Sequence, residues 1–310
     1  MRALIVTNMY PSADRPALGS FVADQVAALR RTGDAEVEVF AFAPGAYAAA
    51  ARTLWARYRR DRFDVVHAHF GLTQWPALAV RARVRAVTLH GTDLAHPRSR
   101  PVTLAGLRVN DLVAVVSEAM AATVPRFALR SRSPRPAVLP AGVDMHRFAA
   151  VDRAEARRRL GLSGDGPLLL FPSDPARREK RHDRALAVAA DVPLLTLSDV
   201  APADVPLWIN AANAVLVPSE REGFGLAVLE ALACDVPVLA TPVGVHPEAL
   251  AGVAGTLCAS FDLDAWKAAL APHVVAGDPR IAGRARAETW STDRMAQRVL
   301  DAWRAHLGRR

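Results

Sequence analysis

The sequence predicts an α/β protein with parallel sheets, and two observations support this class. Short apolar runs of strand length alternate with helical runs along the whole chain, which is the pattern of strand–helix–strand units. The strand-like runs lie at 3–8, 37–42, 64–70, 86–89, 112–117, 168–173, 193–198, 214–218, 237–241 and 255–259. The second observation is length: a chain of 310 residues is long enough for two domains with separate cores.

Composition indicates a soluble globular protein, with 51% hydrophobic and 23% charged residues. No apolar run approaches the roughly 18 residues that a membrane span requires. The segment 1–8 has too short an apolar core for a signal peptide and is better explained as a first strand. Cys234 and Cys258 make no disulfide framework, so we expect a cytoplasmic location.

The chain is strongly basic, with a net charge of +8 and a pI of about 10.5. Its only lysines are Lys180 and Lys267, so nearly all of the positive charge is arginine. A codon bias toward arginine is one explanation, and an anionic partner is the other. The sequence contains no nucleic-acid-binding module. We therefore expect codon bias together with some attraction to an anionic membrane surface.

The first half contains two predicted helices with informative ends. Ser20 is expected to cap a helix over 21–31. A second helix is expected over 46–62, with Ala51, Leu54, Trp55 and Tyr58 on one face and most arginines on others. Such a helix can lie on an anionic membrane, but packing on its own sheet is the more common arrangement.

Histidines follow two of the predicted strands in this half. His67 and His69 are two residues apart, so they share one face of their strand. They lack further metal ligands nearby in sequence, and we interpret them as structural or as supporting another residue. His90 ends the next strand and begins the sequence H-G-T-D, which closes with Asp93. A hydrogen-bonded histidine at a strand end is the ordinary alternative.

The most informative stretch is Ser219 to Glu230, S-E-R-E-G-F-G-L-A-V-L-E. It follows a buried strand at 214–218 and precedes a predicted helix over 227–234, so a helix N-terminus lies at the carboxyl edge of a sheet. Such a turn binds anionic groups through unpaired N–H donors. Glu222 and Glu230 add carboxylates, which accept hydrogen bonds from sugar hydroxyls. This arrangement suits a ligand that has phosphates at one point and hydroxyl groups on either side, and a nucleotide sugar is such a ligand.

The run E-G-F-G-L-A-V-L-E-A-L-A-C-D-V-P-V-L-A-T, 222–241, resembles the signature of glycosyltransferase family 4. The resemblance implies the GT-B fold, in which two Rossmann-like parallel-sheet domains face each other across a cleft. H-G-T-D at 90–93 also resembles a family sequence, and 137–148 resembles its hinge, with Ala141 where asparagine is common. The implied domains are 1–145 for the acceptor, 146–290 for the nucleotide sugar, and a helix at 291–310 that crosses back to the first domain.

The same resemblance implies roles for individual residues. His90 and Glu222 would contact the transferred sugar and are the implied catalytic residues. Lys180 and either Arg177 or Arg178 would neutralise the donor diphosphate, and Glu230 would accept from the ribose hydroxyls. The implied donor-binding residues are Gly19, Arg177, Lys180, Phe224, Gly225, Leu226 and Glu230.

The implied reaction moves a sugar from a UDP- or GDP-sugar to a hydroxyl of a glycan or lipid-linked acceptor, with retention of configuration. No cofactor is expected, and no metal, because no Asp-x-Asp triplet follows a strand. The chain departs from the family at 199–205, where a helix and a strand that help to form the nucleobase pocket are missing. A non-catalytic nucleotide- or sugar-binding module and a nucleotide-sugar epimerase therefore remain alternatives.

Overall fold

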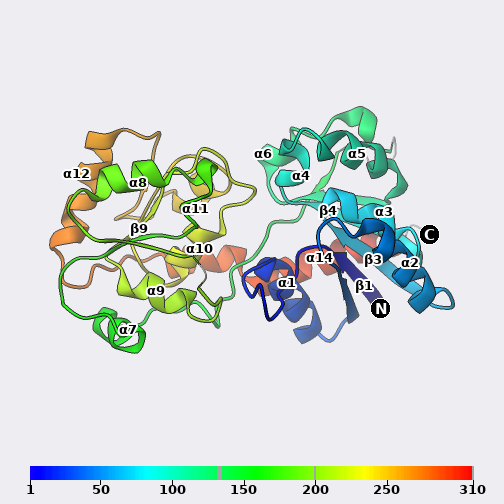
Figure 1. The fold of residues 1–310 in the computed structure, drawn as a ribbon, viewed down its shortest axis with the longest axis horizontal. Coiled ribbons are helices and arrows are strands. Elements are labelled where there is room, and N and C mark those ends of the chain that lie inside the picture. The colour runs from blue at the N-terminus through cyan, green and yellow to red at the C-terminus, as the bar shows by residue number, and fades with distance from the viewer. Residues whose placement is uncertain (131–134, 199, 309–310) are drawn as a thin grey trace. The chain divides into compact units, whose positions relative to one another are not determined.

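The computed structural model describes residues 1–130, 135–198 and 200–308. The chain forms two compact units, Met1–Gly142 with Thr292–Arg310, and Val143–Ser291 (Figure 1). The unit boundaries lie three residues or fewer from those expected after 145 and 290. The C-terminal segment thus belongs to the same unit as the N-terminus. In the part of the chain that the structure describes, no helix is long and apolar enough to cross a membrane.

The first unit is built on a parallel sheet with the strand order β2-β1-β3-β4-β5-β6. Its strands are β1 (Arg2–Thr7), β2 (Glu36–Ala41), β3 (Arg62–His69), β4 (Arg81–Leu89), β5 (Leu112–Val115) and β6 (Ala137–Val138). Its helices are α1 (Ser20–Arg31), α2 (Tyr47–Tyr58), α3 (Gln74–Ala77), α4 (Thr92–Ala95), α5 (Ser99–Gly106), α6 (Glu118–Ala121) and α14 (Thr292–Leu307). The 3₁₀ turns of this unit are η1 (Gly71–Thr73), η2 (Leu107–Val109) and η3 (Arg126–Ala128).

Helices α1 and α14 lie side by side against this sheet (Figure 1). Their apolar faces, with Val26, Leu29 and Trp303 among the buried residues, pack on inward side chains of the strands such as Ile5 and Val65. Apolar residues on one stripe of each helix explain this placement, because burying that stripe removes it from water.

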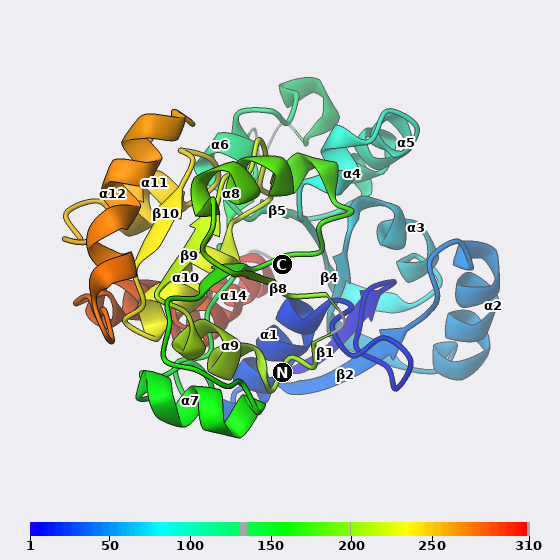
Figure 2. The same cartoon turned by 60° about the vertical axis from the view of Figure 1, so that its left-hand side comes forward.

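The second unit has a parallel sheet with the order β11-β10-β9-β7-β8. Its strands are β7 (Leu169–Phe171), β8 (Leu194–Thr196), β9 (Ala214–Val217), β10 (Val238–Ala240) and β11 (Leu257–Cys258). Its helices and turns are α7 (Arg153–Leu160), η4 (Arg178–Lys180), α8 (His182–Ala189), α9 (Val205–Ala211), α10 (Leu226–Ala233), α11 (His246–Leu250), α12 (Leu263–Val275), α13 (Arg284–Ala287) and η5 (Glu288–Trp290). Figure 2 shows α7 beside α9. Trp266 of α12 and Val188 of α8 pack in one core with Leu169 and Leu216 of the sheet.

Two sequence-based expectations about elements were wrong. Gly19, not Ser20, occupies the cap position of α1, because the backbone there is left-handed with φ 67°, and Ser20 is the first helical residue. The helix expected over 46–62 ends at Tyr58, since Arg62 already pairs with Arg81 in the sheet. The segment 280–290 contains the short α13 followed by η5.

The connection from β8 to β9 passes through α9 alone. Among the described residues between Thr196 and Val205 there is no strand. Strand β8 pairs with β7, and β9 lies on the other side of β7. The sheet is therefore complete around β7 and β9, the two strands that are followed by the predicted donor-binding residues of this unit.

Candidate active-site residues

A predicted donor-binding residue and a predicted catalytic residue meet at the carboxyl edge of the second sheet. Lys180 ends η4, which follows β7, and Glu222 lies in the loop after β9. Because β7 and β9 are parallel neighbours, both loops leave the sheet at the same edge. Lys180 Nζ donates to both carboxylate oxygens of Glu222, at 2.7 Å each. The hydroxyl of Ser219 donates to Glu222 Oε1 at 2.8 Å.

This ion pair is largely shielded from water. The side chain of Lys180 is 15% exposed and that of Glu222 is 8% exposed. A charge so far removed from water is costly unless it is paired and hydrogen-bonded, and here both conditions are met. The pair is thus a preorganised cation and anion beside the start of α10, available to a ligand that has both negative charge and hydroxyl groups.

The loop that presents Glu222 is held from the next strand. The Thr241 hydroxyl, just after β10, donates to the carbonyl of Ser219. The N–H of Val245 donates to the carbonyl of the buried Phe224 at 2.8 Å. Gly225 caps α10 with φ 106°, which favours glycine. These bonds fix the direction in which the first N–H groups of α10 point.

His246 is a residue of this edge that the sequence interpretation missed. Its Nδ1 donates to the carbonyl of Thr241 at 2.8 Å, and burial lowers its pKa. A methyl group at Gly225 would lie 2.5 Å from His246 Nε2, so the ring lies directly against the cap of α10. Its place after strand β10, at the same edge as Glu222, is the signal that could have identified it.

The other predicted donor residues of the second unit lie on the same two loops or on α10. Leu226 is the first residue of α10, and Glu230 lies in its second turn, half-buried. Arg177 is exposed and donates to Glu179 Oε1 at 2.8 Å. Arg178 is also exposed and lines an open pocket of about 900 Å³ together with Arg181, His182 and Glu220. The structure therefore brings Lys180 to Glu222 and leaves both arginines at the surface.

His90 lies at the carboxyl edge of the first sheet, directly after β4. The carboxylate of Asp93 accepts from the N–H groups of His90, Gly91 and Gly71, at 2.8–3.2 Å. Burial raises the pKa of Asp93, while these backbone donors act in the opposite direction. The H-G-T-D sequence thus folds as a turn around its own carboxylate, which fixes the backbone of His90.

Three histidine rings form a stack behind this turn. His67 and His69 lie on one face of β3 as predicted, with ring centroids 4.8 Å apart. His69 Nδ1 lies 3.0 Å from His90 Nε2. His67 bonds Thr88 Oγ1 at 2.7 Å and accepts from Trp303 Nε1 at 3.2 Å. Burial lowers the pKa of all three histidines, that of His69 to about 3, so the stack is uncharged at neutral pH.

Aromatic rings and a tight loop surround His90. Phe21 and Phe70 lie against its ring, with centroids 4.9 and 4.7 Å away. Phe70 has φ 75°, a conformation that costs a bulky residue energy and is found mostly at functional sites. Gly19, before α1, has no room for a side chain, because a methyl group there would lie 2.3 Å from the Met9 carbonyl oxygen.

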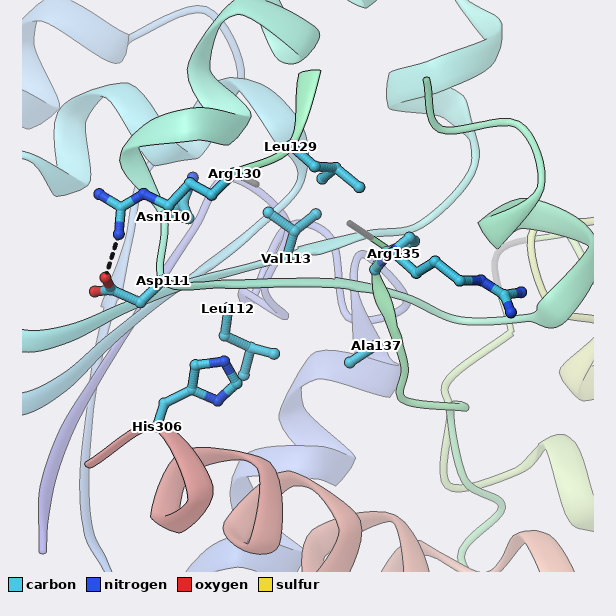
Figure 3. Close-up of a pocket in the computed structure, with 10 residues that line it drawn as sticks. Asn110, Asp111, Leu112, Val113, Leu129, Arg130, Arg135, Ala137 and His306 are labelled. Carbon is cyan, nitrogen blue, oxygen red and sulfur yellow. Dashed lines mark hydrogen bonds and ion pairs between the residues drawn. The ribbon is translucent and has the colours of Figure 1, made fainter. Parts of the chain in front are cut away.

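A further pocket of about 260 Å³ in the first unit lies away from these residues (Figure 3). It opens at the amino ends of β5 and β6, next to Leu112 and Ala137, whereas His90 follows the carboxyl end of β4. Arg130 pairs with Asp111 at 2.6 Å, and Arg135 points away from that pair (Figure 3). The described residues contain no group of three or more His, Cys, Asp or Glu that could hold a metal ion.

Family models match both halves of the chain. The model described as Glycosyltransferase Family 4 matches residues 13–147, and the one described as Glycosyl transferases group 1 matches residues 145–273. A D-inositol 3-phosphate glycosyltransferase from Frankia alni is 30% identical over 79% of this chain and 75% of its own length. One from Mycobacterium avium is 30% identical over 84% of this chain and 73% of its own length.

Solved structures share the fold at low sequence identity. Sucrose-phosphate synthase from Thermosynechococcus elongatus has a TM-score of 0.75 and 18% identity, covering 100% of both chains. Anabaena HepE in complex with UDP-glucose has a TM-score of 0.70 and 16% identity, covering 98% of this chain and 100% of its own. Both likenesses extend over the two parallel-sheet units, which together have the GT-B fold.

Proposed function

The chain belongs to glycosyltransferase family 4 and is a glycosyltransferase, and we propose that it moves a sugar from a UDP- or GDP-sugar to an acceptor hydroxyl with retention of configuration. The observation behind this proposal is the shielded Lys180–Glu222 pair beside the start of α10. Lys180 provides a cation for a diphosphate, and Glu222 provides a carboxylate for sugar hydroxyls. The two groups are in direct contact.

Donor binding would divide this pair between two parts of the ligand. Lys180 would turn one or more of its N–H groups to the diphosphate, where negative charge develops as the glycosidic bond breaks. Glu222 would accept from hydroxyls of the transferred sugar, and Glu230 from the ribose. Arg177 or Arg178 would join them; both are exposed, and Arg177 would have to leave Glu179 to do so. His90 would contact the sugar from the first unit.

We propose that the reaction needs no metal ion, since Lys180 and an arginine provide the positive charge that a divalent ion would otherwise supply. The measurement is nucleotide release with and without a chelator. Equal rates are expected. Activity that is abolished by the chelator and restored by magnesium or manganese would contradict the proposal.

The acceptor is proposed to be a hydroxyl of a glycan or of a lipid-linked molecule. The relatives named above act, by their names, on D-inositol 3-phosphate, which makes that compound a rational member of an acceptor panel. We also propose a cytoplasmic location with weak attraction to the anionic inner face of the plasma membrane, based on the net charge of +8.

The deciding experiment is nucleotide release from a panel of UDP- and GDP-sugars, with and without acceptors. Release that depends on acceptor and is at least tenfold slower in Glu222→Gln supports the transferase. A nucleotide sugar that raises the melting temperature by mass action without any release would instead indicate a binding module. Conversion of the donor to another nucleotide sugar would indicate an epimerase. Retention is read from the anomeric configuration of the product by NMR.

A further inference from the structure

The ring of His90 is hydrogen-bonded to a second histidine, and the direction of that bond decides where His90 keeps its proton. His69 Nδ1 and His90 Nε2 lie 3.0 Å apart, with the two rings nearly parallel at a centroid distance of 5.2 Å. One of these nitrogens must donate and the other accept. The sheet register produces the contact, because His69 pairs with Thr88 and His90 follows two residues later.

Both rings are uncharged, so each holds a single proton. Burial lowers the pKa of His69 to about 3 and that of His90 well below its usual range. Two arrangements remain. Either His90 donates from Nε2 and His69 keeps its proton on its own Nε2, or His69 donates from Nδ1 and His90 keeps its proton on Nδ1.

The second nitrogen of His69 distinguishes the two arrangements. His69 Nε2 is buried and has no hydrogen-bond partner among the described residues. In the first arrangement it would be a buried N–H without an acceptor, which is rare and costly in proteins. In the second arrangement His69 Nε2 is unprotonated, so no N–H group is buried without an acceptor. One proton then lies in the His69–His90 hydrogen bond and the other on His90 Nδ1.

We propose that His69 is a positioning residue that donates from Nδ1 to His90 Nε2 and thereby holds the proton of His90 on Nδ1. His90 then presents an N–H donor, not a lone pair, to its ligand. Within the described residues His90 Nδ1 has no hydrogen bond of its own. That the ligand is a hydroxyl oxygen of the transferred sugar rests on the proposed function, but the position of the proton does not.

The surroundings of His90 fix the plane in which this donor lies. Phe21 and Phe70 pack on the ring, and Phe70 has a positive φ of 75°. Asp93 anchors the N–H of His90 itself. His69 adds the one constraint that these contacts cannot supply, which is the choice between two tautomers of the same ring.

The direct test is long-range proton–nitrogen NMR of the protein labelled with ¹⁵N-histidine, with His90 assigned from the spectrum of His90→Gln. We expect His90 protonated on Nδ1 in the wild type. In His69→Phe we expect a shift toward the Nε2–H form, which a free neutral imidazole favours. A wild-type His90 protonated on Nε2 would overturn the proposal without reference to any variant.

His67→Phe is the matched control, because His67 stacks in the same array but has no hydrogen bond to His90. It should leave the tautomer of His90 unchanged, even if the protein is less stable. If the tautomer of His90 changes as much in His67→Phe as in His69→Phe, the effect is due to packing and the proposal is wrong.

Kinetics test the consequence separately, with UDP-glucose as the first donor probe. His69→Phe should lower kcat about tenfold, the worth of one hydrogen bond, with the donor KM unchanged. His69→Asn, whose amide can still donate to His90 Nε2, should recover part of the loss. A fall in kcat without a tautomer change would contradict the inference. If no nucleotide sugar reacts, the proposed function fails, and the NMR result still decides the role of His69.

Discussion

Glu222 and Glu230 begin and end one loop-helix segment, but their surroundings differ. Glu222 lies in the loop after β9 and is bonded to Lys180 and Ser219, whereas Glu230 lies in the second turn of α10. Contacts that strengthen in the transition state affect kcat, and contacts made equally in the ground state affect KM. If Glu222 holds the transferred sugar and Glu230 the ribose, the two residues have separable kinetic effects.

We therefore expect Glu222→Gln mainly to lower kcat and Glu230→Gln mainly to raise the donor KM. A lost hydrogen bond to a charged acceptor is worth roughly 1.5–3 kcal/mol, or about one to two decades in either parameter. Steady-state kinetics at varied donor concentration provide the measurement, with Glu288→Gln, an exposed glutamate of the same unit, as control. Unchanged kinetics in both variants would show that the site assignment is wrong.

The histidine stack makes the stability of the first unit depend on pH. Burial lowers the pKa of His67, His69 and His90 in the folded state, so the unfolded state binds more protons below pH about 6.5. Their contribution to stability is present in full above that pH. It falls as pH decreases toward the folded pKa values, by up to about 1.4 kcal/mol per pH unit for each histidine.

Urea unfolding at pH 7.5 and pH 5.5 should therefore give a lower free energy of unfolding at pH 5.5. His246 in the second unit acts in the same direction, so His69→Asn is needed to isolate the stack. That variant should show a smaller difference between the two pH values, by about one histidine's share. Equal stability of the wild type at both pH values would mean that the histidines are charged in the folded protein.

Some contacts between individual side chains could be predicted from the sequence, and others could not. The period of two along a strand placed His67 and His69 on one face, and the structure confirms it. The partner of each residue could not be predicted. Glu222 bonds Lys180 across 42 positions only because β7 lies beside β9, and His69 reaches His90 only through the register of β3 on β4. Strand order and register are tertiary properties.

The start of α10 is the element on which donor binding is proposed to depend. Gly225 caps it with φ 106°, and a methyl group there would lie 2.5 Å from His246 Nε2. Gly225→Ala therefore combines a strained backbone with a clash against a buried ring. We expect it to lower the melting temperature and to raise the donor KM at least tenfold, as measured by thermal unfolding and nucleotide release.

Gly161→Ala is the matched control for Gly225→Ala. Gly161 caps the end of α7 with φ 68°, and a methyl group there would meet no atom within 4 Å. It should cost about 1 kcal/mol of backbone strain and leave the donor KM unchanged. Combining Gly225→Ala with His246→Ala should recover part of the lost affinity. If Gly161→Ala and Gly225→Ala behave alike, the clash with His246 is not important.

The ends of elements were harder to predict than their existence. The apolar pattern correctly predicted a helix between 46 and 62, but pairing of Arg62 and Phe63 with β4 ends that helix at Tyr58. Its exposed side also differs from the prediction. Leu54 and Tyr58 are buried as expected, but Trp55, one position from Leu54, is 58% exposed. The end of the helix was decided by strand pairing of the residues after it. This pairing cannot be seen in the local sequence pattern.

The net charge of +8 is a property of the entire protein that packing explains only in part. The buried Ala50, Leu54 and Tyr58 pack α2 against its own unit, chiefly against α3, with Tyr58 on Phe63 of β3, so the helix has a structural reason to be amphipathic. Packing does not account for Trp55, which remains exposed with the Arg59 guanidinium 5.7 Å from its ring. Phe127 of the same unit is 71% exposed, next to Arg126.

Exposed aromatic rings beside arginines are typical of surfaces that bind anionic membranes weakly. Each arginine near such a surface contributes about 1 kcal/mol at most, and salt screens it within about 10 Å at 0.1 M. We therefore expect the protein to float with phosphatidylserine vesicles at low salt and to be released as salt rises. Trp55→Ala should weaken flotation, whereas Leu186→Ala, an exposed apolar residue of the second unit, should not. Absence of binding at low salt would leave codon bias as the explanation of the arginines. Binding that resists high salt would instead indicate hydrophobic insertion, because an electrostatic attraction of this size cannot survive screening.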